Sequence, residues 1–329
     1  NQISDISDLS GMVNLTYLHL YNNQISDVKP LENLVKLTYL HLAVNTISSI
    51  SALSGTVNLT YLYLYNNQIS DVRPLESLVN LTTLELGSNQ IASIDSLSNM
   101  DDLEYLYLYN NNISDISALY GMVSLERLNL NVNQISDISY LQNLVGLTYL
   151  HLGSNNIENI EWLLDLMNLT FLSLNNNNVS DISYLPGMEE LLFLQIQDNN
   201  ISDISFLSSM KRLCYLHLAN NTISSIISLA EMDELQYLYL SSNNISDISS
   251  LSGISSIIEL ELDNNITDIS ALSDMENMKE LKLQNNSISD ISALSSMNAL
   301  IKLNLSNNPL STTMSSSLTT LSSLPTLTT

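Results

Sequence analysis

A motif that recurs every 22 residues runs through almost the whole sequence of 329 residues. Its first complete copy places apolar residues and one asparagine at fixed positions, which are Leu15, Leu18, Leu20, Asn23, Ile25, Val28, Leu31 and Leu34. Further copies open at Leu37, Leu59, Leu81, Leu103, Leu125, Leu147, Leu169, Leu191, Leu213, Leu235, Ile257, Met278 and Leu300. One copy is a residue short, and we place the missing residue between Asn265 and Ile266. Such a period predicts a solenoid, in which each unit buries its apolar side against the next.

Each unit begins with a short alternation of apolar and polar residues. Because successive side chains of a strand point to opposite faces, we expect Leu18 and Leu20 to point into the core. The residues between and beside them, Tyr17, His19 and Tyr21, should then point outward. Stacking of the units predicts one long parallel sheet.

The turns of the repeat carry their own signals. The recurring asparagine, as at Asn45 and Asn67, is expected to pair with backbone groups that the turn leaves without partners. Serines such as Ser117 stand at an N-cap position, and Pro30 and Pro74 stand at the next position, which suits a first helical residue. We therefore predict one short helical turn, often 3₁₀, on the convex side of each unit.

The repeat pattern assigns residues 1–310 to the solenoid. Asn1 already occupies the asparagine position, so the first unit is partial. Residues 311–329 are rich in Ser and Thr, yet a three-residue spacing of leucines favours a continuation into a further, truncated repeat. Because solenoids need caps at their ends, we expect the chain to be an ordered fragment of a longer protein.

Two units carry a more specific motif after the asparagine, ISDVKPL at residues 25–31 and ISDVRPL at residues 69–75. This I-x-D-I-x-P-L pattern resembles the 22-residue leucine-rich repeats of the bacterial internalin family, and the units also resemble those of eukaryotic Ser/Thr-phosphatase regulatory subunits. The resemblance implies an α/β fold, a right-handed leucine-rich-repeat solenoid with its sheet on the concave face and 3₁₀ or helical turns on the convex face. The internalin resemblance also implies adhesion to a receptor, usually another protein.

Aromatic residues concentrate at the outward strand positions. Of sixteen tyrosines, thirteen fall in three outward columns, and all four histidines share the middle column. The candidate binding face comprises Tyr17, His19, Tyr21, Tyr39, His41, Tyr61, Tyr63, Tyr65, Tyr105, Tyr107, Tyr109, Tyr149 and His151. Duplicated repeats copy their tyrosines, and stacked rings stabilise a sheet, which is a structural explanation. An exposed surface of Tyr and His also suits partner binding, and the two explanations are compatible.

The outward positions change character along the chain. Units from Ile257 onward carry charged residues there, which include Glu259, Glu261, Lys282 and Lys302. We therefore place the contact region in the aromatic stretch from residue 17 to residue 109, and the charged end is a candidate for setting the orientation of a partner.

The net charge of −25, with only nine basic residues, argues against nucleic acid and against acidic membrane surfaces as partners. Part of this charge is a column of aspartates at Asp27, Asp71, Asp115, Asp137, Asp181, Asp203, Asp247, Asp268 and Asp290. Oxygen-rich columns can bind Ca²⁺. Hydrogen bonds from turn or helix N–H groups explain the column better, so we expect no metal site and no cofactor.

No catalytic constellation is predicted from the sequence. The histidines fall on separate strands, and Glu85 stands among neutral neighbours. Cys214 lies beside strand leucines, where an inert, partly buried thiol is expected. We therefore predict that the chain is not an enzyme.

These observations predict a recognition or adhesion module, outside or on the surface of a microbial cell, that binds a protein receptor or a surface glycan. No direct membrane insertion is expected from this sequence. One alternative is a cytoplasmic regulatory scaffold of a phosphatase-like enzyme. Another is a structural component of a surface layer or filament, which self-associates through the same face.

Overall fold

The computed structural model describes residues 1–185 and 187–310. Contacts between residues divide the chain into two compact units, the first formed by Asn1–Leu169 and the second beginning at Thr170. The predicted continuation of the repeat over residues 311–329 lies outside the described residues.

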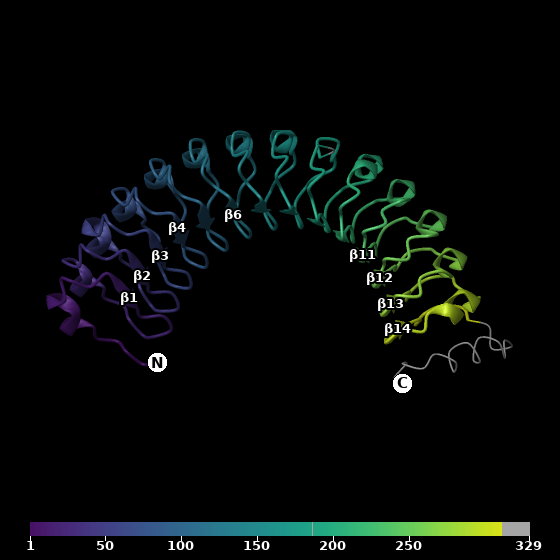
Figure 1. Cartoon of the computed structure of the whole chain (residues 1–329), viewed down its shortest axis with the longest axis horizontal. Coiled ribbons are helices and arrows are strands. Elements are labelled where there is room, and N and C mark those ends of the chain that lie inside the picture. Colours follow the sequence, from purple (N-terminus) through teal and green to yellow (C-terminus); the bar gives the residue numbers. More distant parts are fainter. Residues whose placement is uncertain (186, 311–329) are drawn as a thin grey trace. The chain divides into compact units, whose positions relative to one another are not determined.

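The first unit contains seven parallel strands, which are β1 (Tyr17–His19), β2 (Tyr39–His41), β3 (Tyr61–Tyr63), β4 (Thr83–Glu85), β5 (Tyr105–Tyr107), β6 (Arg127–Asn129) and β7 (Tyr149–His151). Its short helices are all 3₁₀, namely η1 (Ser7–Gly11), η2 (Lys29–Leu31), η3 (Ser51–Gly55), η4 (Arg73–Leu75), η5 (Asp95–Leu97), η6 (Ser117–Leu119), η7 (Ser139–Leu141) and η8 (Glu161–Leu163). The strands line the inner side of the unit's curve and the 3₁₀ helices its outer side (Figure 1).

The second unit repeats this plan with strands β8 (Phe171–Ser173), β9 (Phe193–Gln195), β10 (Tyr215–His217), β11 (Tyr237–Tyr239), β12 (Glu259–Glu261), β13 (Glu280–Lys282) and β14 (Lys302–Asn304). Its 3₁₀ helices are η9 (Ser205–Ser209), η10 (Ile227–Leu229), η11 (Ser249–Leu251), η12 (Ser270–Leu272) and η13 (Ser292–Ser296). In both units neighbouring strands are parallel and in register, as where Tyr17 lies beside Tyr39 and Tyr215 beside Tyr237. The predicted fold class is thereby confirmed.

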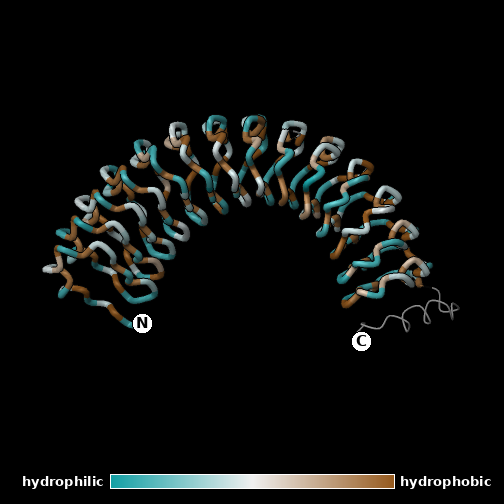
Figure 2. Tube along the Cα trace, in the orientation of Figure 1, coloured by the Kyte–Doolittle hydropathy of each residue, from teal (hydrophilic) through white to brown (hydrophobic). Residues whose placement is uncertain are grey.

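The core consists of the repeated apolar positions. The inward leucines of the inner strands, such as Leu40, Leu62 and Leu216, are fully buried. Hydrophobic segments recur along each repeat of both units (Figure 2). At roughly 25 cal/mol per Å² of apolar surface, burial of each such leucine contributes about 2 kcal/mol. The outward direction of the intervening strand residues follows from this inward set.

The asparagine column forms the predicted hydrogen-bonded ladder. The Asn67 side-chain amide donates to the carbonyl of Leu64 at 3.0 Å and to that of Leu42, one repeat earlier, at 3.1 Å. Its Oδ1 accepts the Ile47 N–H at 3.0 Å. Each asparagine therefore joins two consecutive repeats and satisfies backbone groups that the turn would otherwise bury without partners.

The residue before each ladder asparagine adopts a left-handed conformation, as at Asn66 with φ of 53° and Ser242 with φ of 56°. The short repeat lacks this residue. Asn264 takes the ladder position, because its amide donates to the Leu240 carbonyl at 2.9 Å and the next residue binds one repeat back, from the Asn265 N–H to the Ile245 carbonyl. The prediction that the deletion follows Asn265 is therefore wrong, since the missing residue precedes Asn264.

The 3₁₀ helices begin one residue earlier than predicted. Ser117 is the first helical residue of η6 and not its N-cap, which is Ile116. Pro30 is correspondingly the second residue of η2. The capping group is the aspartate two residues before the helix, since Asp115 Oδ1 accepts the Ser117 N–H at 2.8 Å. The same contact recurs along the aspartate column.

Candidate functional site

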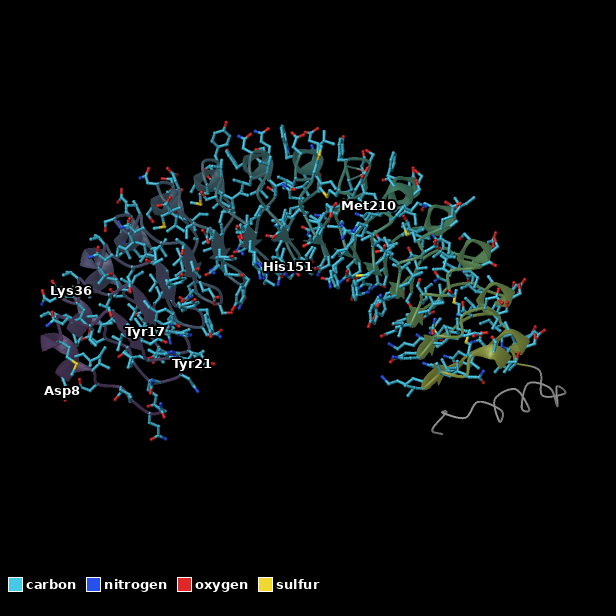
Figure 3. The ribbon with its side chains drawn as sticks, viewed as in Figure 1. Asp8, Tyr17, Tyr21, Lys36, His151 and Met210 are labelled. Atoms are coloured by element: carbon cyan, nitrogen blue, oxygen red, sulfur yellow. The ribbon has the colours of Figure 1, made fainter. Side chains whose placement is uncertain are left out.

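The outward strand residues of the first unit form three columns. All thirteen predicted site residues lie in these columns, which also contain Ala43, Thr83, Glu85, Gly87, Arg127, Asn129, Asn131 and Gly153. We call this surface the aromatic face. Tyr21 and His151 lie on the strand side of the unit, whereas Asp8 lies with the 3₁₀ helices on the other side (Figure 3).

Strands β1 to β3 bring their rings into one continuous block. Tyr17 stacks on Tyr39 with ring centroids 4.2 Å apart and planes 12° from parallel. In the middle column His41 stacks between two rings, at 4.5 Å from His19 and 4.9 Å from Tyr63. The parallel, in-register pairing of the strands places like positions side by side, so rings of the first and middle columns meet the rings of the next repeat. In the third column the next repeat has Ala43, and the Tyr21 ring lies 5.1 Å from His41 instead.

The exposure of this block is graded. Tyr17 is 57% exposed, Tyr61 43% and Tyr21 41%, whereas His41 is only 9% exposed. Burial, together with the charge of His19, lowers the pKa of His41 to about 4. His41 is therefore a neutral ring at neutral pH, and its Nδ1 accepts the Ala43 N–H at 3.4 Å.

Burial also disfavours ionisation of several phenol groups of the aromatic face by raising their pKa. The pKa of Tyr39 is raised to about 12, first by burial and second by its hydrogen bond with Tyr17. Burial likewise raises the pKa of Tyr63, Tyr65 and Tyr107. The face therefore offers apolar ring surface and uncharged hydroxyl groups, a combination that suits protein interfaces.

Strand β4 interrupts the rows of rings. It places Thr83 and Glu85 in the first and middle columns, and Gly87 follows in the third. A Cβ atom at Gly87 would overlap the Tyr109 ring, so this glycine allows the ring to lie on the backbone. Burial raises the pKa of the Glu85 carboxyl. The aromatic face is therefore divided at β4 by a short segment without aromatic side chains.

Beyond β4 the predicted residues lie on β5 and β7, on either side of Arg127. The Tyr105 hydroxyl donates to Glu126 Oε2 at 3.2 Å. Tyr149 and His151 occupy the first and middle columns of β7, the last strand of the unit. Burial raises the pKa of Tyr149.

The second unit holds another aromatic cluster, which the predicted site omitted. The Tyr215 ring lies 5.9 Å from Phe193, 6.0 Å from Tyr237 and 5.5 Å from Tyr239, measured between centroids. His217 lies 4.9 Å from Tyr239. These residues belong to the same outward columns, so column membership alone could have found them.

The charged residues at the end of the second unit pair with one another. Lys282 Nζ lies 3.2 Å from Glu280, 3.3 Å from Glu261 and 3.8 Å from Glu259. Lys302 makes a second contact with Glu280, at 2.7 Å. The glutamates and lysines at the outward positions of this region therefore form a local ion-pair network.

The described residues contain no group of three or more His, Cys, Asp or Glu side chains arranged to hold a metal ion. The Cys214 thiol contacts the Leu192 carbonyl at 3.3 Å, and burial raises its pKa, so the reactive thiolate is disfavoured. Over residues 1–185 and 187–310, no helix has the length and apolar character needed to cross a membrane.

Comparison with known proteins agrees with the repeat architecture. A family model described as leucine-rich repeats in two copies matches residues 1–33, 13–55, 35–77, 57–99, 79–121, 101–144, 123–164, 145–187 and 233–274. Two further leucine-rich-repeat models match residues 189–245 and 299–321. No curated protein gives a match.

Among solved structures, an internalin of Listeria monocytogenes, InlF, is 33% identical with a TM-score of 0.88, over 91% of this chain and 89% of InlF. A leucine-rich-repeat protein of Leptospira interrogans shares the fold at 21% identity and a TM-score of 0.83, over 99% of this chain and 93% of that protein. The plant peptide hormone receptor RGFR1, solved in complex with RGF2, also shares the fold. It is 22% identical with a TM-score of 0.83, over 98% of this chain and 60% of the receptor.

The chain therefore belongs to the leucine-rich-repeat family, and its repeats are of the internalin type. The predicted family resemblance is confirmed. This fold is typical of protein-binding modules and is generally non-enzymatic.

Proposed function

We propose that the chain is a non-enzymatic recognition module that binds a protein receptor through the aromatic face of its first unit. The observation that carries this proposal is the block of stacked and partly exposed rings on β1 to β3. Tyrosine supplies rigid apolar area and a hydroxyl group at a small entropic cost, which is why it is frequent among residues that dominate binding energy. The thirteen site residues named above are the proposed contact set.

A rigid sheet also favours binding without rearrangement. The side chains of the block are already stacked on one another, so little rotamer entropy remains to be lost on association. Net charge of −25 opposes nucleic acid as the partner. A surface glycan is the runner-up, since tyrosine rings also stack on sugars.

The test compares two sets of tyrosine substitutions. In one variant Tyr61, Tyr63, Tyr105 and Tyr107 are changed to Ala. In the control variant the tyrosines on the 3₁₀ side, Tyr120, Tyr140 and Tyr184, are changed to Ala. The wild type and the control should capture proteins from the surface of candidate target cells, and the first variant should not. A glycan array probed with the same three proteins tests the glycan alternative. Equal binding by all three would refute the aromatic face as the contact surface.

We further propose that the module acts outside a microbial cell, which its similarity to an internalin supports. Protease treatment of intact producing cells should then cleave it. Protection in intact cells, with cleavage only after lysis, would favour the cytoplasmic scaffold. Sedimentation of the purified chain addresses self-association, and a persistent monomer would remove the surface-layer alternative.

A further inference from the structure

Glu85 occupies the centre of the segment that interrupts the aromatic face. In the middle column it pairs in register with Tyr63 of β3 on one side and Tyr107 of β5 on the other. Neighbouring strands lie roughly 4.8 Å apart, so both tyrosines are immediate neighbours of the carboxylate. Its own strand carries buried Thr83, and Gly87 follows with the Tyr109 ring over it.

The Glu85 carboxylate acts electrostatically on these tyrosines. Burial is the largest cause of the raised pKa of Tyr63 and of Tyr109, and the charge of Glu85 is the second cause for both. The same charge contributes at Tyr65 and Tyr107. We call Glu85, Tyr63, Tyr65, Tyr107 and Tyr109 the Glu85 cluster.

No cation of the described residues pairs with this carboxylate, since Arg127 acts on the Tyr107 hydroxyl and burial is the only cause of the pKa shift at Glu85. Within the described part of the chain, no residue forms an ion pair or a hydrogen bond with the Glu85 side chain, and burial is the cause of its raised pKa. In the three outward columns of the first unit, which is described throughout, Glu85 is the only carboxylate. Half-buried charges are costly unless they are paired, and structural carboxylates are normally hydrogen-bonded.

Glu261 shows what a satisfied carboxylate looks like at the same repeat position. It stands in the middle column of β12, with Tyr239 beside it on β11 and Lys282 on β13. Lys282 Nζ lies 3.3 Å from its carboxylate. The repeat therefore accommodates a lysine ammonium beside a glutamate and a tyrosine, and at Glu85 the position of that lysine is taken by Tyr107.

We propose that the Glu85 cluster receives the cationic head of a lysine or arginine side chain from the partner protein. This proposal rests on the proposed function and specifies the chemistry of its partner. A cation above the cluster would pair with the Glu85 carboxylate and contact tyrosine ring faces, which attract cations through their quadrupole. Since the carboxylate is already partly desolvated, the pair is stronger than one on an open surface.

The test uses a small probe and needs no identified partner. N-acetyl-lysine methylamide is titrated into the full chain at constant ionic strength, and the ring signals of ¹³C-labelled tyrosines are followed by NMR. N-acetyl-arginine methylamide is a second arm, and N-acetyl-norleucine methylamide is the uncharged control of similar shape. The variants are Glu85→Gln and, as a matched control at the same repeat position, Glu261→Gln.

We expect saturable shifts at Tyr63, Tyr107 and Tyr109 with the lysine or the arginine probe and none with norleucine. Glu85→Gln should weaken the binding by roughly tenfold, because the charge is lost while the side-chain shape is kept. Glu261→Gln should leave it unchanged. Circular dichroism checks that both variants are folded.

Equal responses of the wild type and Glu85→Gln to both cationic probes would overturn the cation site, as would an equal response to norleucine. Neither result depends on partner capture by the tyrosine variants. The cation site and the aromatic contact face can therefore fail separately.

Discussion

Glu85 and Glu261 stand at the same position of the repeat, in units that open at Leu81 and Ile257, and they meet different surroundings. Glu85 lies between two tyrosines and has no ionic partner among the described residues. Glu261 lies beside a tyrosine and within 3.3 Å of Lys282. Within the described residues, the first unit thus leaves the Glu85 carboxylate without an ionic partner, whereas the charged end of the second unit pairs its carboxylates with lysines. A common scaffold supports both because the buried positions and the outward positions of a strand vary independently.

The largest expected effect tests whether the scaffold really is common to the two units. Asn111→Ala and Asn221→Ala each remove a buried ladder side chain that binds three carbonyls and one N–H group. Each should lower the free energy of unfolding by roughly 3 kcal/mol, since the groups left behind are buried without partners. Urea unfolding measures this, and a large difference between the variants would break the equivalence.

A second comparison concerns the histidines of the middle column. Burial lowers the pKa of His41 to about 4, and it also lowers that of His217, where the charges of Glu261 and Asp198 oppose it. A histidine whose pKa is depressed by folding contributes stability above its unfolded pKa of about 6.5, and this is lost as pH falls through the folded pKa. NMR should show His217 titrating above His41. His41→Phe should remove roughly 2 kcal/mol of the stability loss between pH 7 and pH 4; an unchanged acid profile contradicts this.

The two glutamates should respond to neutralisation with opposite signs. Glu85→Gln removes a partly buried charge without a partner and should raise the free energy of unfolding at pH 7 by up to about 1 kcal/mol. Glu261→Gln weakens the network around Lys282, which is partly exposed, and should lower it by about 1 kcal/mol after discounting for solvent screening. Urea unfolding midpoints of the two variants, measured side by side, test these opposite signs. Stability changes of the same sign would contradict the difference between the two glutamates.

The smallest expected effect is the pH dependence of that contrast. Folding raises the pKa of Glu85, so stability is retained below the unfolded pKa and lost as pH rises through the folded pKa. Folding lowers the pKa of Glu280, through its hydrogen bond with Lys302 first, so its contribution is lost as pH falls. The gain from Glu85→Gln should therefore vanish on acidification below about pH 4.5, whereas Glu280→Gln should cost stability at pH 7 and this loss should fade only at lower pH, through the lowered folded pKa. Persistence of either at low pH would contradict this assignment.

The period of 22 residues sufficed to predict the strands, the inward leucines and the asparagine ladder, because each depends on contacts between equivalent positions. The shortened turn was misplaced because two adjacent asparagines, Asn264 and Asn265, read equally well by spacing, and only their hydrogen bonds distinguish them. The serines are not the helix caps, although the sequence predicted them as such. The aspartate two residues earlier, such as Asp115, accepts the N–H of the serine, which is itself the first helical residue.

The candidate site divides in the same way. Membership of the outward columns was readable for every residue from Tyr17 to His151. The isolation of Glu85 among neutral neighbours is readable from the sequence, where it argues only against catalysis. Its significance depends on desolvation and on the placement of Tyr109 over Gly87, neither of which a linear pattern contains.

The ladder asparagines also bear on how such a chain can change its length over generations. Each one binds only its own repeat and the preceding one, as Asn67 does with Leu64 and Leu42. A duplication or loss of a whole repeat therefore recreates every bond at the new junction. The shortened turn before Asn264 shows that a smaller change is also accepted where it removes only the left-handed residue. The number of strands can thus change by gain or loss of whole repeats, while the outward residues of any one strand change by single substitutions.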